Sequence, residues 1–137
     1  MIIPNGHLVL IGTTASGKSS LSIEVAKKRP ILEIISMDSM AIYQGMNIGT
    51  ATPSHEEQSE IQHHLINIVE PTEEFSVSQF QEAANNSLME IEDRKQKALL
   101  VGGTGLHVRA VVDNLSIPGQ FPEVKREIES EIDTTKL

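Results

Sequence analysis

Hydrophobic residues along the chain fall into short continuous runs and into longer stretches with a regular spacing. The continuous runs are four or five residues long and rich in Ile, Leu and Val, which is typical of strands buried on both faces. Such runs predict strands at residues 8–11 and 98–101, and the short segment at residues 31–35, rich in β-branched residues, predicts another. Residues 65–69 alternate apolar and polar side chains, which also predicts a strand.

The regularly spaced stretches predict helices. In residues 76–94 an apolar side chain recurs every three or four positions, which makes one face of a helix apolar. The residues of this stripe are Val77, Phe80, Ala84, Leu88 and Ile91. Shorter helices are predicted at residues 18–28, 54–61, 104–112 and 122–133. The first of these places Leu21 and Val25 on one face, and the second begins with a capping-box pattern of Ser54 and Glu57.

Strands that alternate with helices predict right-handed crossovers and a mainly parallel sheet. Between the second strand and the second helix, residues 36–53 lack a clear period and are predicted to form a long ordered loop, of the kind that is usually functional. We therefore expect a single three-layer α/β domain over residues 1–137. The last helix, residues 122–133, has a narrow apolar stripe and nothing follows it. We expect this helix to begin a C-terminal part that the chain lacks, as in a truncated protein.

Composition narrows the function classes. Of the 137 residues, 39% are hydrophobic and none is cysteine, which excludes disulfides, thiolate metal sites and a cysteine nucleophile. The net charge of −8 argues against a domain that binds nucleic acid through an overall positive charge. No apolar stretch approaches the length needed to span a bilayer, and the N-terminus lacks the pattern of a secretory signal. These features predict a cytoplasmic protein with no membrane partner.

The strongest motif is a P-loop, with the pattern G-x-x-x-x-G-K-S between a predicted strand and a predicted helix. Backbone amides of such a loop, together with the helix N-terminus, create positive potential for a phosphate. Lys18 is expected to contact the phosphates and the Ser19 hydroxyl to ligate Mg²⁺. The residues expected to bind a diphosphate or nucleotide are Gly12, Thr13, Thr14, Ala15, Ser16, Gly17, Lys18 and Ser19. The fold is thus predicted to be P-loop NTPase-like, and the motif alone indicates a nucleotide hydrolase or kinase with ATP as its ligand.

Asp38 follows the second predicted strand, so it should lie at the carboxyl edge of the sheet, where open α/β folds bind ligands. A carboxylate there can bind Mg²⁺ or act as a general base. The alternative is a turn-forming or helix-capping Asp, and the residues alone leave both open.

Three further features have two interpretations each. Thr104, after Gly102 and Gly103, is either a helix N-cap or a substrate contact. The adjacent His63 and His64 point to opposite faces if they lie on a strand, which favours structural or surface roles over a shared metal. Arg109, Lys125 and Arg126 form either a small basic patch or an ordinary solvated face.

Taken together, several segments resemble the bacterial tRNA dimethylallyltransferase family, also called tRNA isopentenyltransferase or IPP transferase. The P-loop is shared by many families, whereas Asp-Ser-x-x-x-Tyr-x-Gly-Met-x-Ile-Gly-Thr-Ala within residues 35–51 is much more specific. The other matching segments, in family order, are residues 63–68, 75–80, 99–106 and 122–125. The resemblance covers nearly all of this chain but only about the N-terminal half of the family's.

The resemblance implies transfer of a dimethylallyl group from dimethylallyl diphosphate to the exocyclic amine of an adenosine beside the tRNA anticodon. Asp38 would then deprotonate that amine, while the P-loop, Lys18 and Mg²⁺ held through Ser19 would stabilise the leaving diphosphate. Asp38, Lys18 and Thr104 are accordingly the expected catalytic residues. The expected tRNA-contacting residues are Asp38, Ser39, Met40, Ala41, Thr104 and Lys125.

The chain departs from the family's pattern at three positions within these segments. Thr13 replaces a proline, and Gln44 and Thr52 replace basic residues near the expected RNA path. Three other functions also stay open. They are a small-molecule P-loop kinase, an adenylate isopentenyltransferase, and an inactive domain that binds diphosphates without turnover. A separate C-terminal half is expected among the partners.

Overall fold

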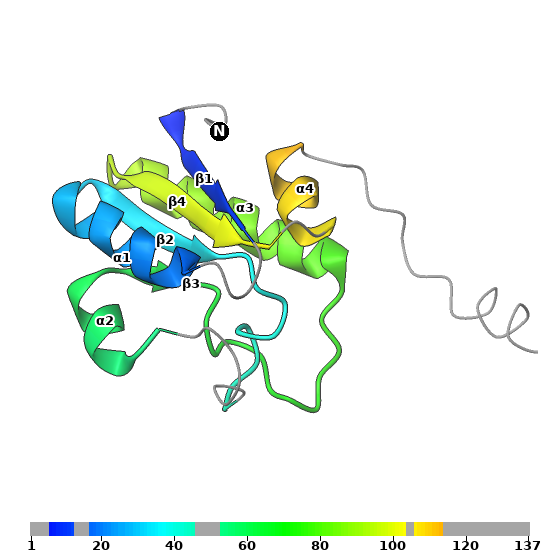
Figure 1. Cartoon of the computed structure of the whole chain (residues 1–137). Helices are drawn as coiled ribbons and strands as arrows, with labels where there is room; N and C mark the ends of the chain where they lie inside the picture. Colours follow the sequence, from blue (N-terminus) through cyan, green and yellow to red (C-terminus); the bar gives the residue numbers. More distant parts are fainter. Residues whose placement is uncertain (1–5, 13–16, 46–52, 104–105, 114–137) are drawn as a thin grey trace, which may run out of the picture.

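The computed structural model describes residues 6–12, 17–45, 53–103 and 106–113. Its sheet has four parallel strands in the order β1-β4-β2-β3 (Figure 1). The strands are β1 Leu8–Ile11, β2 Leu32–Ser36, β3 His63–His64 and β4 Lys97–Gly102. The prediction of a mainly parallel sheet is confirmed for the described residues.

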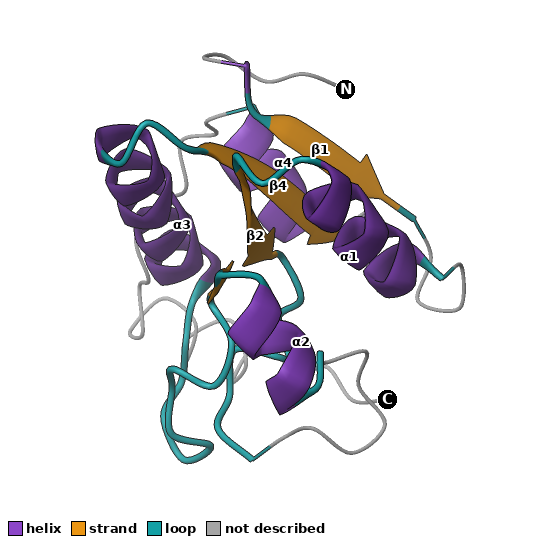
Figure 2. Ribbon diagram, turned by 90° about the vertical axis from the view of Figure 1, so that its left-hand side faces the viewer, coloured by secondary structure: helices purple, strands orange, loops and turns teal. Residues whose placement is uncertain are grey.

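Helices cover both faces of this sheet. The covering helices are α1 Lys18–Lys28, α3 Val77–Asp93 and α4 Leu106–Val112, while α2 His55–Glu60 has no buried residue. The first helix packs on one face, and α3 and α4 pack together on the other (Figure 2). The result is the three-layer α/β arrangement that the alternation of strands and helices predicts.

Alternating side chains of the central strands build a core on each face. In β2, Leu32 and Ile34 join Ile23 and Ala26 of α1. The next residue, Ile35, faces the second core, which α3 and α4 share. Because both faces of the sheet are covered, the central strands are apolar almost throughout, as the continuous hydrophobic runs predict.

The capping box predicted at Ser54 and Glu57 is confirmed by hydrogen bonds, and the structure shows a second one at the start of α3. Ser54 accepts the amide of Glu57, whose carboxylate accepts the amide of Ser54, at 3.1 and 3.0 Å. Ser76 and Gln79 make the same reciprocal pair at the start of α3. These bonds satisfy amides that have no partner within the helix, and they set where each helix begins.

The predicted apolar face of α1 is confirmed at Val25, which packs against the core, and is wrong at Leu21. Leu21 is 48% exposed, while Ser22, Ile23 and Ala26 are the buried residues of this helix. Ser22 is accommodated because its hydroxyl donates to the backbone carbonyl of Ser19 at 2.6 Å, so no polar group is left without a partner. Because the buried face of α1 includes the polar residue Ser22, the pattern of hydrophobic residues predicted the wrong face at Leu21.

The strand predicted at residues 65–69 is also wrong. The strand in this region, β3, contains only His63 and His64. Leu65 and Asn67 have positive φ angles of 64° and 54°, which end the extended backbone. Amides of the following residues bond instead to the loop after β2, and Val69 forms an isolated bridge with Tyr43. The alternating pattern reflects burial of Leu65 and Val69, not a strand.

Other boundaries differ slightly or fall outside the described residues. The second strand begins at Leu32, where the pairing with β4 begins. Ile31, the predicted first residue, lies before this pairing and is 47% exposed. The part of the predicted loop that is described, up to residue 45, has turns and no helix. The predicted helix at residues 122–133 lies outside the described residues, so both its existence and the expected C-terminal truncation stay predictions.

A buried carboxylate joins the strands to the end of α3. Glu33 of β2 is 7% exposed and accepts two hydrogen bonds from Arg94, at 3.1 and 2.6 Å. It also lies 2.7 Å from Nε2 of His64. Burial by itself raises the pKa of Glu33, but the hydrogen bonds and charges of Arg94 and His64 outweigh it and lower that pKa. The positive charge of Arg94 and the hydrogen bonds of both partners thus stabilise the buried carboxylate of Glu33.

Gly102 is the position where β4 approaches its neighbours too closely for a side chain. A Cβ atom there would lie 2.6 Å from Cβ of Met37 and 3.1 Å from Cγ2 of Val108. The Gly102→Ala variant is therefore expected to lower the free energy of unfolding by about 1–3 kcal/mol through overpacking. Urea denaturation of both proteins measures this difference.

Gly103→Ala is the matched control, because a Cβ atom at Gly103 meets nothing within 4 Å. Its free energy of unfolding is expected to stay within about 0.5 kcal/mol of the unmodified chain. Equal destabilisation by the two changes would contradict the close approach at Gly102.

Candidate functional site

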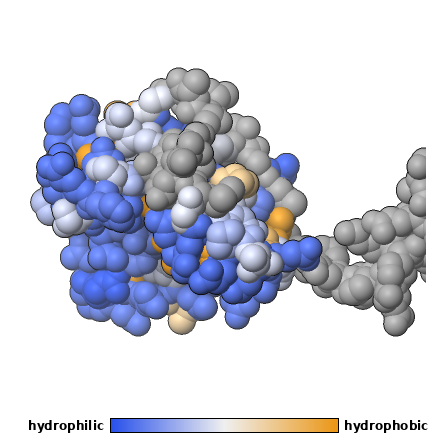
Figure 3. Space-filling view, turned by 90° about the horizontal axis from the view of Figure 1, so that it is seen from below, coloured by the Kyte–Doolittle hydropathy of each residue, from blue (hydrophilic) through white to orange (hydrophobic). Residues whose placement is uncertain are grey.

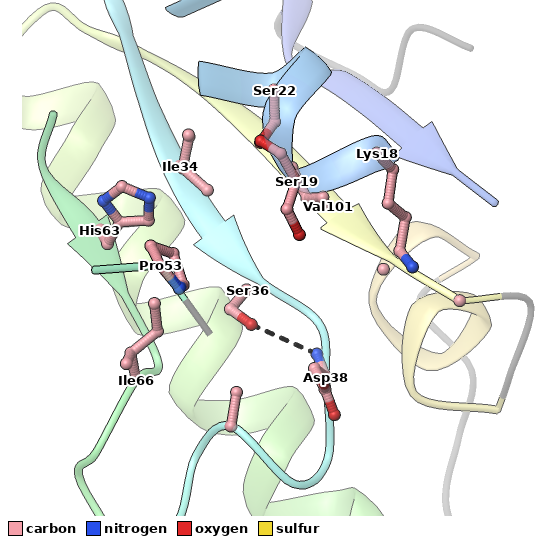
Figure 4. Close-up of a pocket in the computed structure, with 13 residues that line it drawn as sticks. Lys18, Ser19, Ser22, Ile34, Ser36, Asp38, Pro53, His63, Ile66 and Val101 are labelled. Carbon is pink, nitrogen blue, oxygen red and sulfur yellow. Dashed lines mark hydrogen bonds between the residues drawn. The ribbon is translucent and has the colours of Figure 1, made fainter. Parts of the chain in front are cut away.

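A pocket lies at the carboxyl edge of the sheet, between the ends of β2 and β4 and the start of α1 (Figure 4). Lys18 and Ser19 approach it from α1, and Ser36 and Asp38 from the end of β2. An apolar wall completes the pocket. The residues of this wall are Ile34, Ala41, Pro53, Ile66 and Val101. The pocket therefore offers a charged and hydroxyl-bearing side next to an apolar side.

The motif at residues 12–19 has the strand–loop–helix context that phosphate binding requires. The amide of Gly12 donates to the carbonyl of Gly102 at 3.2 Å, which joins the start of the loop to the end of β4. Gly17 precedes α1 with a φ of 75°, a left-handed conformation that favours glycine. Four of the predicted diphosphate-binding residues, Thr13, Thr14, Ala15 and Ser16, lie outside the described residues, so their roles stay predictions.

Lys18 and Ser19 form the first turn of α1 and line the pocket. That first turn contains no acidic residue, whereas Lys27 and Lys28 occupy the last turn. The helix dipole therefore presents uncompensated positive potential toward the pocket. An anionic group of a ligand is the chemistry that this end of the pocket favours.

Asp38 has the turn-forming role that the sequence leaves open, and it also lines the pocket, while its catalytic role stays a prediction. Its Oδ1 atom accepts the amide of Met40 at 2.8 Å, so the carboxylate shapes the turn after β2. Its own amide donates to Oγ of Ser36 at 3.4 Å. Asp38 also lines the pocket across from Lys18 (Figure 4). One oxygen thus orders the turn, and the same carboxylate is available to a ligand.

His63 is a wall residue for which sequence reasoning expected no part in the site. Its Nδ1 atom lies 2.7 Å from the carbonyl of Ile61, so Nδ1 carries the proton and donates. Its Nε2 atom is buried without a hydrogen-bond partner among the described residues. Burial lowers the pKa of His63. His64 points to the opposite face, toward Glu33, as the strand geometry predicts.

His107 of α4 is a second histidine close to the site. Its ring meets Phe80 edge-on at a centroid distance of 4.9 Å. Burial lowers the pKa of His107, while the negative charge of Asp38 acts in the opposite direction. The neighbourhood of Asp38 therefore contains an imidazole whose pKa is lowered, which no motif in the sequence indicates.

These two histidines make the stability of the fold depend on pH. Because both folded-state pKa values lie below the ordinary value of 6.5, the unfolded chain binds more protons in the window just below pH 6.5. The free energy of unfolding is expected to fall as the pH decreases through this window. Urea denaturation at a series of pH values measures the slope, which His63→Asn is expected to reduce. An unchanged slope in that variant would contradict the assignment.

The remaining predicted contact residues differ in their placement. Ala41 is buried in the pocket wall, whereas Ser39 and Met40 are exposed on the turn beside it. Thr104 and Lys125 lie outside the described residues. Arg109 is exposed and lies 3.7 Å from Asp113, and the other residues of the suggested basic patch are not described. Their roles stay predictions.

The described surface on one side of the molecule is predominantly hydrophilic. Figure 3 views the molecule from below Figure 1, and most described residues on that side are polar, with small apolar spots between them. Within the described ranges no group of three His, Asp or Glu side chains is arranged to hold a metal ion. None of the described helices has the length and apolar character needed to cross a membrane.

Comparison with known proteins gives consistent results. The model of the family described as IPP transferase matches residues 41–137. A tRNA dimethylallyltransferase of Bifidobacterium adolescentis is 46% identical over 88% of this chain and 37% of its own length. One from Francisella philomiragia is 50% identical over 89% of this chain and 40% of its own length. The chain thus spans about two-fifths of the length of these curated relatives.

Solved structures agree in fold. The tRNA isopentenylpyrophosphate transferase of Bacillus halodurans superposes with a TM-score of 0.75 and 39% identity, over 94% of this chain and 43% of that one. A eukaryotic dimethylallyltransferase acting on tRNA has a TM-score of 0.74 and 29% identity, over 89% of this chain and 31% of that one. The fold is P-loop NTPase-like, as the motif and the alternation of elements predict. With its pocket at the carboxyl edge of the sheet and a family model that matches most of its length, this chain belongs to the IPP transferase family.

Proposed function

We propose that this chain carries the diphosphate-binding and base-bearing part of an enzyme that transfers a dimethylallyl group to tRNA. The group would move from dimethylallyl diphosphate to the exocyclic amine of an adenosine next to the anticodon. The observation that carries the proposal is the joint presence of Lys18, Ser19 and Asp38 in one pocket with an apolar wall. Lys18 and Ser19 suit the diphosphate of the donor, Asp38 suits the amine of the acceptor, and the apolar wall suits the dimethylallyl group.

In the proposed reaction the amine nitrogen of adenosine forms a bond with the first carbon of the dimethylallyl group. The bond between that carbon and the diphosphate oxygen breaks, and diphosphate leaves with the electron pair. Asp38 accepts the proton that the amine releases. Lys18, the loop amides at residues 12–17 and the N-terminus of α1 stabilise the negative charge on diphosphate as it develops.

The proposal includes Mg²⁺, whose preference for oxygen ligands fits the hydroxyl of Ser19 and the oxygens of a diphosphate. When bound, the ion would neutralise part of the charge on the diphosphate. Two of the oxygen-bearing side chains that line the pocket, Ser19 and Asp38, come from the first turn of α1 and from the segment after β2.

The proposed nucleic-acid partner is the anticodon loop of tRNA, contacted by residues 38–41, Thr104 and Lys125. The adenine would have to leave its stack to reach Asp38. Five apolar residues of the pocket wall would exclude water from the dimethylallyl group. A tRNA substrate fits a cytoplasmic location.

The direct test incubates the 137-residue chain with dimethylallyl diphosphate, Mg²⁺ and unmodified tRNA, followed by mass spectrometry of the nucleosides. Prenylated adenosine is the expected product. Diphosphate binding without product would show that this chain alone is an inactive binding domain. Product on free adenosine monophosphate but not on tRNA would indicate an adenylate isopentenyltransferase, and ATP-dependent phosphorylation of a metabolite would indicate a kinase.

A further inference from the structure

The side chain of His63 brings a hydrogen-bond acceptor without a donor into the wall of the candidate site. Its Nδ1 atom donates to the carbonyl of Ile61 at 2.7 Å, so the second ring nitrogen, Nε2, has a lone pair and no proton. Nε2 is buried and has no hydrogen-bond partner among the described residues. Because burying an acceptor without a donor is costly, this nitrogen indicates a place where a ligand can donate a hydrogen bond.

The ring keeps this acceptor at neutral pH. Burial lowers the pKa of His63 below its ordinary value of 6.5, and it outweighs the bond to Ile61 and the charge of Glu57, which act in the opposite direction. Nε2 therefore stays unprotonated and can only accept. A ligand group that meets it must carry an O–H or an N–H.

His63 lies at the apolar end of the pocket. It pairs with Ile34 across the strands β3 and β2, and both residues line the pocket. Figure 4 shows them with Pro53 and Ile66 on the side away from Lys18. A ligand whose anionic group is held by Lys18 and the start of α1 would therefore direct its opposite end toward His63.

The size of the cavity indicates which part of a ligand reaches this end. The cavity measures about 110 Å³. For comparison, an apolar cavity of roughly 150 Å³ in another protein holds benzene, so this cavity suits a group of about five or six non-hydrogen atoms. It has no room for a purine ring beside a prenyl group. The part next to His63 would thus be the end of the five-carbon chain of the donor, and not the adenine.

A dimethylallyl group leaves Nε2 of His63 without a partner, because all of its hydrogens are bonded to carbon. Other polar atoms of the pocket already have bonds. The hydroxyl of Ser22 donates to the carbonyl of Ser19 at 2.6 Å. Oγ of Ser36 accepts the amide of Asp38 at 3.4 Å. A hydroxyl group at the far end of the five-carbon chain would donate to Nε2, while the carbons of the chain would still contact the apolar wall.

We propose that His63 is a specificity-determining residue, which selects an allylic diphosphate with a hydroxyl group at the far end of its five-carbon chain. The inference rests on the proposed function, because it concerns the same pocket and the same transfer. The amine nitrogen bonds to the first carbon, the bond from that carbon to the diphosphate oxygen breaks, and diphosphate leaves with the electron pair. Asp38 accepts the proton of the amine, and the terminal hydroxyl keeps its own proton.

The test compares two donors on the 137-residue chain, dimethylallyl diphosphate and 4-hydroxy-3-methylbut-2-enyl diphosphate. Isothermal titration calorimetry at neutral pH, in the presence of Mg²⁺, gives the dissociation constant of each. The hydroxylated donor is expected to bind at least about fivefold more tightly, the effect of one hydrogen bond to a buried acceptor. Because the two donors share the diphosphate, the ratio of their dissociation constants reports the contribution of the hydroxyl.

Substitutions at His63 separate the acceptor from the shape of the wall. His63→Leu removes the acceptor and is expected to reduce the preference for the hydroxylated donor by about tenfold, with little change for dimethylallyl diphosphate. His63→Gln keeps an oxygen that can accept, and it is expected to retain part of the preference. A general loosening of the fold would weaken both donors alike and leave the ratio unchanged.

The control variant is His55→Leu, which replaces an exposed histidine of α2 that does not line the pocket. Both dissociation constants are expected to equal those of the unmodified chain. Equal affinity for the two donors in the unmodified chain would overturn the inference, and it is the result expected if an ordered water satisfies Nε2. A ratio that His63→Leu does not alter would also overturn it. If His63→Leu does not fold, the ratios in the unmodified chain and in His63→Gln still decide.

Mass spectrometry of tRNA incubated with each donor distinguishes this inference from the proposed function. Preferential binding of the hydroxylated donor without any prenylated adenosine would support the inference and contradict the proposed function for this chain. Prenylated adenosine with equal affinity for both donors would do the reverse. Binding of neither donor would overturn both.

Discussion

Asp38→Asn is expected to reduce prenyl transfer to tRNA by about 10²–10⁴-fold, the range over which a positioned general base acts. The change removes the charge and the capacity to accept a proton. It keeps an oxygen that can accept the amide of Met40, so the turn after β2 is expected to persist. Single-turnover formation of prenylated adenosine, measured with dimethylallyl diphosphate in excess, gives the rate.

Asp93→Asn is the control for this prediction, because it makes the same chemical change at an exposed position at the end of α3. Its rate is expected to equal that of the unmodified chain. Dimethylallyl diphosphate should bind Asp38→Asn with little change in affinity. A rate within threefold or so of the unmodified chain would remove Asp38 from the chemistry, since even a weak general base contributes about 10²-fold.

Lys18→Ala is expected to weaken the binding of dimethylallyl diphosphate by about 10–150-fold. This range corresponds to about 1.5–3 kcal/mol for the loss of a hydrogen bond between charged groups. The side chain approaches the pocket from the first turn of α1, where the helix dipole also favours an anion. Isothermal titration calorimetry in the presence of Mg²⁺ measures the dissociation constant.

The matched control is Lys28→Ala, which removes the same charge from the last turn of the same helix. Its affinity for the diphosphate is expected to change by less than about threefold, because an exposed charge this far along the helix is screened by solvent and salt. Equal losses in the two variants would mean that net charge, and not contact at the helix start, controls binding.

Local sequence patterns predicted most of the fold. Continuous apolar runs located β1 and β4, and a β-branched segment located β2, because strands covered on both faces need such residues. The capping pattern of Ser54 and Glu57 predicted where α2 begins, because its bonds depend only on residues three positions apart. The failures at Leu21 and at residues 65–69 share a cause: the buried face of a helix and the path of a loop depend on distant neighbours.

For the site, the sequence by itself determined the chemistry: a phosphate-binding loop after a strand, a lysine and a serine opening the next helix, and an aspartate after the second strand. Each of these follows from residue type and local spacing. Only the tertiary structure decided that Lys18 and Asp38 share one pocket, that His63 forms part of its wall and that Glu33 is buried against Arg94. These contacts join residues 20 to 61 positions apart. The parallel sheet creates the pocket because it brings the carboxyl ends of strands that are distant in sequence to one edge, whereas Glu33 meets Arg94 near the amino ends of β2 and β4, at the end of α3.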